Sequence, residues 1–368
     1  MNNDRKPLPV SIYCVWQWWE QHYQHQHGRP EHIDYDWLDR HYLGRRRFLF
    51  EQFGRFGLGA EKPELDKYFV SRLLPYHTIL IPVLLGTQAS IQQEGGYCWQ
   101  NLSEAEMHKI RPVDIANSPV GELIHQEYQK LKSRYGTVTQ MIDLASVTNN
   151  AFTMRGPEFY ADLLAEKEFA REYMDVIAET MCLAYKFITN LFGPIDGFPL
   201  GNCNVTMISP ELYIEIIRDY DIRCVQFAAD LTQKPPSCNI HHCNVNTEPF
   251  AGAYRAIPGL KSLQGSCLSD IENIHAVLPE VNFSAMINPV DLITNPVRPI
   301  EEQLEYCISR NASDLAIWDI DTSFGPDSMV KLFSQIENIA GKYYRKASFD
   351  VIPFTWEELD WEFPGFRG

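Results

Sequence analysis

The 368-residue sequence has no long uninterrupted hydrophobic run. Its longest strongly apolar stretch, Thr78–Leu85, contains a proline and falls far short of the roughly 20 residues that a helix needs to cross a bilayer. The N-terminal residues Met-Asn-Asn-Asp-Arg-Lys-Pro are polar, whereas a secretory signal has an apolar core. We therefore expect a cytoplasmic protein with no membrane partner.

Positive charge is also scarce, because 32 Lys and Arg face 48 Asp and Glu and the formal net charge is −16. Nucleic-acid binding needs clustered cations, so we exclude nucleic acid as a partner. The nine cysteines are an odd number in a chain without a signal, which favours reduced thiols or metal ligands over a disulfide framework. No Gly-x-Gly-x-x-Gly or phosphate-loop lysine motif follows a predicted strand, so a dinucleotide-binding fold has no support.

Short apolar runs alternate with helical patterns from about residue 70 onward. A regular succession of strand, polar loop and helix is typical of parallel strands joined by helical crossovers. We therefore predict an α/β fold, a (β/α)8 TIM barrel with an N-terminal extension. The predicted strands are Thr78–Leu85, Val138–Leu144, Cys224–Phe227, Ser237–Ile240, Ser262–Gln264, Val281–Ile287 and Asp314–Ile320. Helices are predicted at 169–192, from Ser209-Pro210-Glu211 onward, at 328–340, and after capping boxes at Ser103–Glu106 and Ser269–Glu272.

The first 50 residues differ from the rest in composition. Tryptophans 16, 18, 19 and 37 are interleaved with histidines 22, 25, 27, 32 and 41. The histidines have no convincing ligand spacing, which favours an extension packed by its tryptophans over a metal site. We divide the chain into this extension (1–50), a catalytic barrel (51–345) and a C-terminal tail (346–368).

Reactive groups of such barrels come from the carboxyl ends of the strands. The chain has polar residues at those places, and from them we take Asn150, Asn204, Asp319 and Asp321 as candidate catalytic residues. Asn288 and Ser266 are candidate substrate-binding residues, together with Arg155 in the loop nearby. Two further strand-end thiols, Cys203 and Cys267, are alternative metal ligands.

His241-His242-Cys243 follows the predicted strand Ser237–Ile240 and is the sharpest local feature. In an extended chain, residues two apart point to the same side, so His241 and Cys243 can offer a nitrogen and a thiolate to one zinc ion. The competing interpretation is a buried cysteine next to a hydrogen-bonded histidine.

Five segments together resemble the uroporphyrinogen decarboxylase superfamily. The likeness extends over about residues 70 to 340, and the family is a (β/α)8 barrel. The matching segments are His241–Asn244, Leu263–Asp270, Phe283–Leu292, Ala151–Asp162 and Met207–Tyr213.

The resemblance implies one of two chemistries. True uroporphyrinogen decarboxylases carry a Met-Arg-Gln-Ala-Gly-Arg signature, of which Phe50–Arg55 keeps only Gly-Arg, and no histidine follows His275. A substrate with several carboxylates also needs several cations. The chain is closer to the second branch, the methyltransferases that serve corrinoid proteins and move a methyl group between cobalt and a thiol.

In that branch a His-x-Cys pair and a distant cysteine after the last core strand hold zinc. His241 and Cys243 match the pair, but no cysteine follows Cys307, and Asp319 and Asp321 stand at the expected place. The resemblance therefore implies a zinc methyltransferase with an Asp, which we take to be Asp321, as third metal ligand. The Asp-x-His-x-x-Gly corrinoid signature is missing, so methylcobalamin would arrive on a partner corrinoid protein.

A lyase of the same fold is the alternative. It would decarboxylate a small acid without metal, with Asp319 or Asp321 as acid–base group and Arg155 or Arg55 as carboxylate anchor. The N-terminal segment could make the contacts of a homodimer. The methyl donor, the acceptor and the oligomeric state are not fixed by the sequence.

Overall fold

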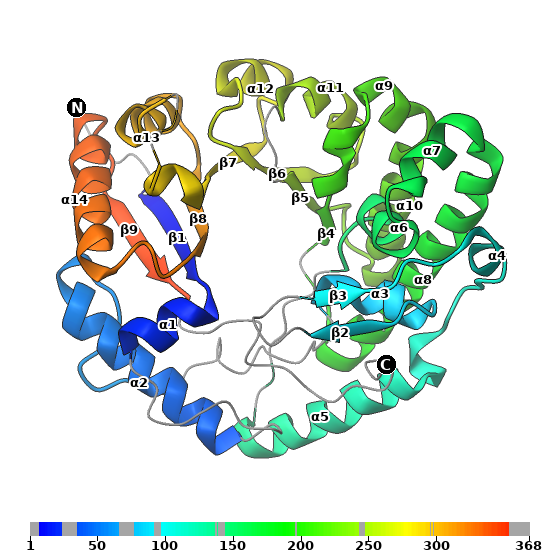
Figure 1. Cartoon of the computed structure of the whole chain (residues 1–368), viewed down its shortest axis with the longest axis horizontal. Coiled ribbons are helices and arrows are strands. Elements are labelled where there is room, and N and C mark those ends of the chain that lie inside the picture. The colour runs from blue at the N-terminus through cyan, green and yellow to red at the C-terminus, as the bar shows by residue number, and fades with distance from the viewer. Residues whose placement is uncertain are drawn as a thin grey trace.

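Seven parallel strands form the central sheet of the computed structural model, which describes residues 7–23, 35–65, 77–91, 97–136, 138, 144–195, 197–242, 247–294, 296 and 298–352. The strand order is β4-β5-β6-β7-β8-β1-β9, and every neighbouring pair is parallel. The sheet is curved, with helices on its outer side (Figure 1). The strands are β4 Phe198–Gly201, β5 Cys238–His242, β6 Leu260–Ser266, β7 Asn282–Ile287, β8 Asp314–Ile320, β1 Leu8–Cys14 and β9 Ala347–Val351.

The described helices follow the strands or cover the sheet. Two short strands, β2 Ala89–Ile91 and β3 Tyr97–Trp99, pair antiparallel away from the main sheet. The helices are α1 Trp16–Tyr23, α2 Tyr35–Phe53, α3 Leu80–Leu84, α4 Glu104–Met107, α5 Pro119–Tyr135, α6 Val147–Arg155, α7 Glu158–Ala165, α8 Lys167–Phe192, α9 Pro210–Leu212, α10 Arg218–Thr232, α11 Ala251–Tyr254, α12 Ile271–Val277, α13 Ile300–Ser309 and α14 Pro326–Lys342. A short π-helical segment, Tyr213–Ile217, joins α9 to α10.

The two faces of the sheet differ in chemistry. Successive side chains of a strand point to opposite faces. On the outer face Phe283, Leu315 and Ile317 are fully buried in the main hydrophobic core. On the inner face, β6 and β7 present polar side chains at every second position, at Ser262, Gln264, Ser266, Asn282 and Ser284. The outer face therefore supplies the stability of the sheet, and the inner face is left for polar chemistry.

Four of the predicted strands are confirmed as β5, β6, β7 and β8, and for β8 the bounds agree. Two are wrong. Thr78–Leu85 is a 3-10 turn followed by α3, because a short apolar run alone does not distinguish a buried strand from a buried helix. Cys224–Phe227 lies within α10, whose buried residues recur with helical spacing. Val138–Leu144 falls largely outside the described residues.

The helix predictions are confirmed with one local correction. Helix α8 ends at Phe192, and Gly193 follows with a φ of 93°, a conformation that glycine adopts without steric cost. Ser209 caps α9 through its side chain. At the start of α12, however, the cap is Asp270, which accepts from Asn273 N, and not Ser269.

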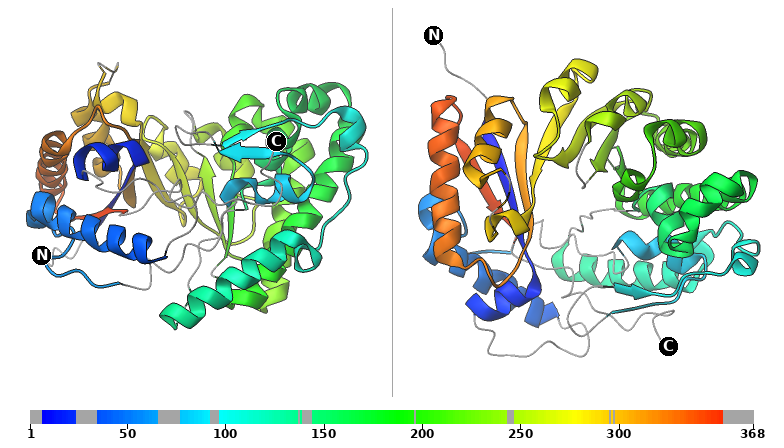
Figure 2. Two further views of the ribbon diagram at one scale, coloured as in Figure 1. Left: turned by 60° about the horizontal axis from the view of Figure 1, so that its bottom comes forward. Right: turned by 45° about the horizontal axis from the view of Figure 1, so that its top comes forward.

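The N-terminal segment takes part in the sheet, contrary to our description of residues 1–50 as an extension. Strand β1 lies between β8 and β9 (Figure 2, right) and pairs with both. Trp18 and Trp19 of α1 are fully buried in the main core, which confirms packing by tryptophans. Residues 347–351 of the predicted tail form the edge strand β9. The first and the last strand along the chain, β1 and β9, thus come from segments that we had placed outside the barrel.

Barrel closure is not established, because β4 and β9 are the edges of the sheet in the part of the chain that the structure describes. In the same residues no helix is both long and apolar enough to cross a bilayer.

Candidate functional site

His241 lies one residue before the carboxyl end of β5, on the inner face. Its Nδ1 is 2.6 Å from Oε1 of Gln264, its register partner on β6. Its ring also stacks on Trp318 of β8, with 5.8 Å between ring centroids and 16° between planes. A hydrogen bond on one nitrogen and a parallel ring fix the orientation of an imidazole.

Asp319 is an acidic residue at the end of β8 whose pKa is affected by the charge of His241. It sits near the end of β8 with a φ of 60°, which turns the chain at that point. Burial by its surroundings raises the pKa of Asp319, and the charge of His241 lowers it. Asp319 therefore lies within electrostatic range of His241, near the carboxyl edge of the sheet.

Asp321 has a local structural partner. Its Oδ1 accepts hydrogen bonds from the backbone N of Ser323, at 2.8 Å, and from the Ser323 hydroxyl. Asp321 is thereby tied into the turn that precedes α14. Its predicted roles as metal ligand and catalytic group stay predictions, but Asp319 is the better placed of the two acids.

A small hollow of about 60 Å³ lies between the loop after β7 and the loop after β8. Asp319, Asp321 and Phe324 line it, together with Pro289, Val290, Leu292 and Ile293. The two loops therefore meet beside the acidic residues.

Cys243 and Asn244 lie outside the described residues, as do Val245 and Asn246. Among the residues that are described, no three His, Cys, Asp or Glu side chains gather as a metal site. The predicted pair of His241 and Cys243 thus has one member placed, and it stands where the prediction put it.

Three other predicted residues lie at the same edge. Asn204 receives a hydrogen bond from Tyr160 on its backbone oxygen and donates its backbone N to Asn149. Asn288 accepts from Val290 N and caps a 3-10 turn, and Ser266 accepts from Leu268 N. These contacts shape the loops at the edge, and the catalytic or binding roles of the three residues stay predictions.

Asn150 and Arg155 serve the structure. Asn150 is fully buried and donates its amide to the backbone oxygens of Leu144 and Ser146. Arg155 forms a largely buried ion pair with Asp162, 2.8 Å between Nε and Oδ2, which also raises the pKa of the guanidinium. The guanidinium of Arg155 thus has a partner within the protein, and its role as a substrate anchor stays a prediction.

Arg55 is engaged elsewhere too. Its Nη2 donates to the Ser334 hydroxyl of α14 at 2.8 Å, and its guanidinium lies over the ring of Phe56. Both arginines that the lyase alternative would use as anchors thus have partners within the protein, and their anchoring role stays a prediction.

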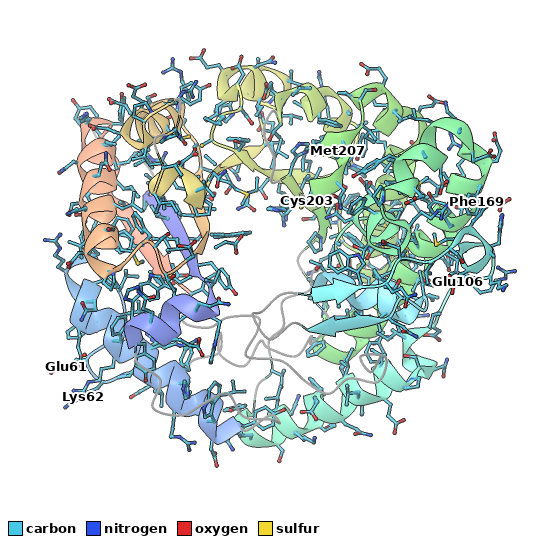
Figure 3. The ribbon with its side chains drawn as sticks, in the orientation of Figure 1. Glu61, Lys62, Glu106, Phe169, Cys203 and Met207 are labelled. Atoms are coloured by element: carbon cyan, nitrogen blue, oxygen red, sulfur yellow. The ribbon has the colours of Figure 1, made fainter. Side chains whose placement is uncertain are left out.

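The alternative thiols divide into two kinds. Cys267 is buried and donates to Gln303, while Cys307 donates to the backbone oxygen of Cys267. The contact with Cys267 and burial raise the pKa of Cys307, so this pair belongs to the core. Cys203, in contrast, is only partly buried and lies with Met207 after β4, toward the centre of the view in Figure 3.

Sequence reasoning missed Gln264, Trp318, Ser284 and Asp314 as neighbours or supports of His241. One signal was present. In the strands β6 and β7 a polar residue recurs at every second position, where a barrel interior is usually filled by apolar side chains. Such alternation in a parallel sheet marks a polar inner face.

A second buried polar cluster lies behind the site. His242, next to His241, faces the opposite side, is fully buried and contacts the Tyr254 hydroxyl through Nδ1 at 2.8 Å. Asp221 of α10 is also fully buried and accepts from Asn202 and Tyr213. Burial, and to a lesser extent His241, lowers the pKa of His242 to about 4. Burial raises the pKa of Asp221 to about 6, although both of its hydrogen bonds oppose this shift.

Comparison with known proteins gives a structural likeness. No protein-family model matches the chain, and no curated protein sequence matches it. Among solved structures, a methyltransferase from Methanosarcina mazei superposes with a TM-score of 0.58 at 10% identity, covering 92% of this chain and 95% of that one. At this identity the likeness shows a shared fold over nearly the whole chain.

Proposed function

We propose that the protein is a zinc-dependent methyltransferase that moves a methyl group between a corrinoid carried by a partner protein and a thiol. The observation that carries the proposal is the placement of His241. It stands near the carboxyl end of β5, and its Nδ1 is held by Gln264. The structural likeness to a methyltransferase supports the same interpretation.

The residues present fit a zinc ion. His241 supplies an imidazole nitrogen, Cys243 follows two residues later with a thiolate, and Asp319 supplies a carboxylate beside the histidine. One nitrogen, one sulfur and one oxygen are accepted zinc ligands, and three protein ligands leave a fourth position open. A zinc ion bound there would hold the acceptor sulfur as a thiolate near neutral pH.

The chain's own residues would orient and shield this chemistry. Gln264 and Trp318 keep the His241 ring in one orientation. Large apolar side chains lie exposed on the loops after β4, β6 and β7, as expected for the contact with a corrinoid protein. These residues are Met207, Leu268, Val290 and Ile293.

Metal analysis of the purified, tag-free chain tests the proposal. We expect about one zinc per chain by inductively coupled plasma mass spectrometry and turnover of methylcobalamin with thiols. Cys243→Ser should lose the metal while the fold is kept. Cys203→Ser is the matched control, because it removes a thiol from the same edge and should keep the metal.

One observation favours the lyase as the second candidate, the raised pKa of Asp319, because a general acid must hold its proton closer to neutral pH. A folded preparation that takes up no zinc on reconstitution would overturn the methyltransferase proposal. Asp319 would then be tested as an acid with a screen of small carboxylic acids.

A further inference from the structure

A row of four polar side chains crosses the inner face, from His241 near the carboxyl end of β5 to Asp314 at the amino end of β8. The row consists of His241 on β5, Gln264 on β6, Ser284 on β7 and Asp314 on β8, and each is the register partner of the next. Nδ1 of His241 lies 2.6 Å from Oε1 of Gln264, and Nε2 of Gln264 lies 3.2 Å from the Ser284 hydroxyl. The Ser284 hydroxyl in turn contacts Oδ1 of Asp314. We call this set the polar row.

The polar row has one direction of donation, and Asp314 sets it. A carboxylate only accepts hydrogen bonds. The Ser284 hydroxyl lies at Oδ1 of Asp314, and the Ser313 hydroxyl lies between Oδ2 of Asp314 and the backbone oxygen of Phe283. The Ser284 hydroxyl therefore donates its one proton to Asp314, and its oxygen accepts a hydrogen bond from the amide nitrogen of Gln264.

The amide of Gln264 is then fixed as well. With its nitrogen donating to Ser284, its oxygen faces His241, so Nδ1 of His241 must carry the proton. A neutral imidazole with its proton on Nδ1 has its lone pair on Nε2. We propose that Asp314, acting through Ser284 and Gln264, is a positioning residue that sets the tautomer of His241 and makes Nε2 its ligand or base nitrogen.

The polar row orients the imidazole and does not conduct protons. A proton could pass through the Gln264 amide only if the amide first became the much less stable imidic acid tautomer. The Asp314 end is also suited to a fixed charge. Asp314 is the first residue of β8 and lines an open groove of about 850 Å³ at the amino edge, with Asn282 and Arg345. There the carboxylate stays near water while its effect reaches the carboxyl edge through three hydrogen bonds.

This inference deepens the proposed function and rests on it for the use made of Nε2. The tautomer itself is a property of the metal-free chain. It can therefore be measured, and can fail, independently of zinc binding and of methyl transfer.

The test is long-range ¹H–¹⁵N correlation on full-length, chelator-treated protein labelled with ¹⁵N-histidine at pH 8, with the His241 signals assigned by His241→Gln. We expect a single Nδ1–H form in the wild type. Ser284→Ala and Asp314→Asn should shift His241 to a mixture with the Nε2–H form, because each frees the Gln264 amide to turn over. Ser284→Thr keeps the hydroxyl and should restore the single form.

Ser262→Ala is the matched control. It removes a hydroxyl from the same face of β6 whose hydrogen bond, within the described part of the chain, goes to Asn239, so the His241 signals should not move. An Nε2–H form in the wild type, or unchanged His241 signals in Ser284→Ala, would overturn the proposal. If Asp314→Asn does not fold, the Ser284→Ala and Ser284→Thr pair decides. A wild type with the Nδ1–H form but no zinc uptake would sustain the tautomer assignment and defeat the proposed function.

Discussion

His241 and His242 are neighbours in the chain and lie on opposite faces of one strand. His241 is partly exposed on the inner face, where its partners are a glutamine, a tryptophan and an acid. His242 is fully buried on the outer face, among aromatic rings. Two histidines that are adjacent in the sequence thus lie in different surroundings: His241 is partly exposed among polar groups, and His242 is buried in the core.

The contrast extends along the sheet. At Phe283 and Ser284, as at Ile317 and Trp318, an apolar outward residue is followed by an inward residue with a hydrogen-bonding group. A polar group in a core is tolerated only when its hydrogen bonds are met. On the inner face, polar groups can instead be arranged for chemistry, which is why we place the candidate site on this face.

The largest expected effect comes from the histidine pair itself. His241→Asn keeps a polar atom near the position of Nδ1 and removes Nε2, so the chain should lose zinc. The loss of affinity should exceed the roughly 10–100-fold that removal of a supporting hydrogen bond costs. His242→Asn keeps an acceptor for Tyr254 and should keep the metal. Metal analysis of both variants is the measurement. Loss of zinc in His242→Asn alone would mean that His242, and not His241, binds the metal.

The next effect concerns stability. Phe283→Ala removes a fully buried ring from the outer face and should lower the free energy of unfolding by about 3–5 kcal/mol. Asn282→Ala, one residue earlier on the inner face, should change it by less than about 0.5 kcal/mol. Urea unfolding of both variants measures the difference. Similar losses would mean that the inner face also carries core stability.

The two titratable groups of the second buried polar cluster, His242 and Asp221, should respond to pH in opposite directions. The pKa of His242 falls from 6.5 to about 4 on folding, so the stability it contributes is lost as pH falls through that window. The pKa of Asp221 rises from 3.8 to about 6, so its contribution is lost as pH rises through its own window. Each shift corresponds to about 3 kcal/mol, and between pH 4 and 6 the two nearly cancel in the wild type.

Single variants separate the two contributions. Relative to the wild type, Asp221→Asn should become more stable as pH rises from 4 to 6, and His242→Asn should become less stable over the same range. Urea unfolding at a series of pH values gives both curves. Curves that run parallel to the wild type would show that neither group changes its pKa on folding.

The same contrast explains what the sequence predicts well. Strand β8 is a continuous run of seven residues bounded by polar turns, and α8 carries a regular apolar stripe ended by glycine; both signals are local. The strand-end position of His241 follows because parallel strands end at one edge. Its partner Gln264 could not be found, since the register of β5 against β6 depends on contacts 23 residues apart. Strand β1 was missed because Pro9 and the tryptophans after it obscured an alternating pattern.

The smallest expected effect separates the two acids after β8. Asp319 has a φ of 60°, and asparagine tolerates this conformation well, so Asp319→Asn should keep the backbone. We expect it to weaken zinc binding by at least roughly 10-fold, because a neutral amide replaces the carboxylate that we propose as the third ligand, and loss of a supporting group alone costs that much. Asp321→Asn still offers an oxygen to Ser323 and should leave zinc binding unchanged. Zinc titration against a competing chelator distinguishes the variants. Weakening in Asp321→Asn alone would make Asp321 the third ligand, as the resemblance implied, and would require the turn before α14 to open when the metal binds.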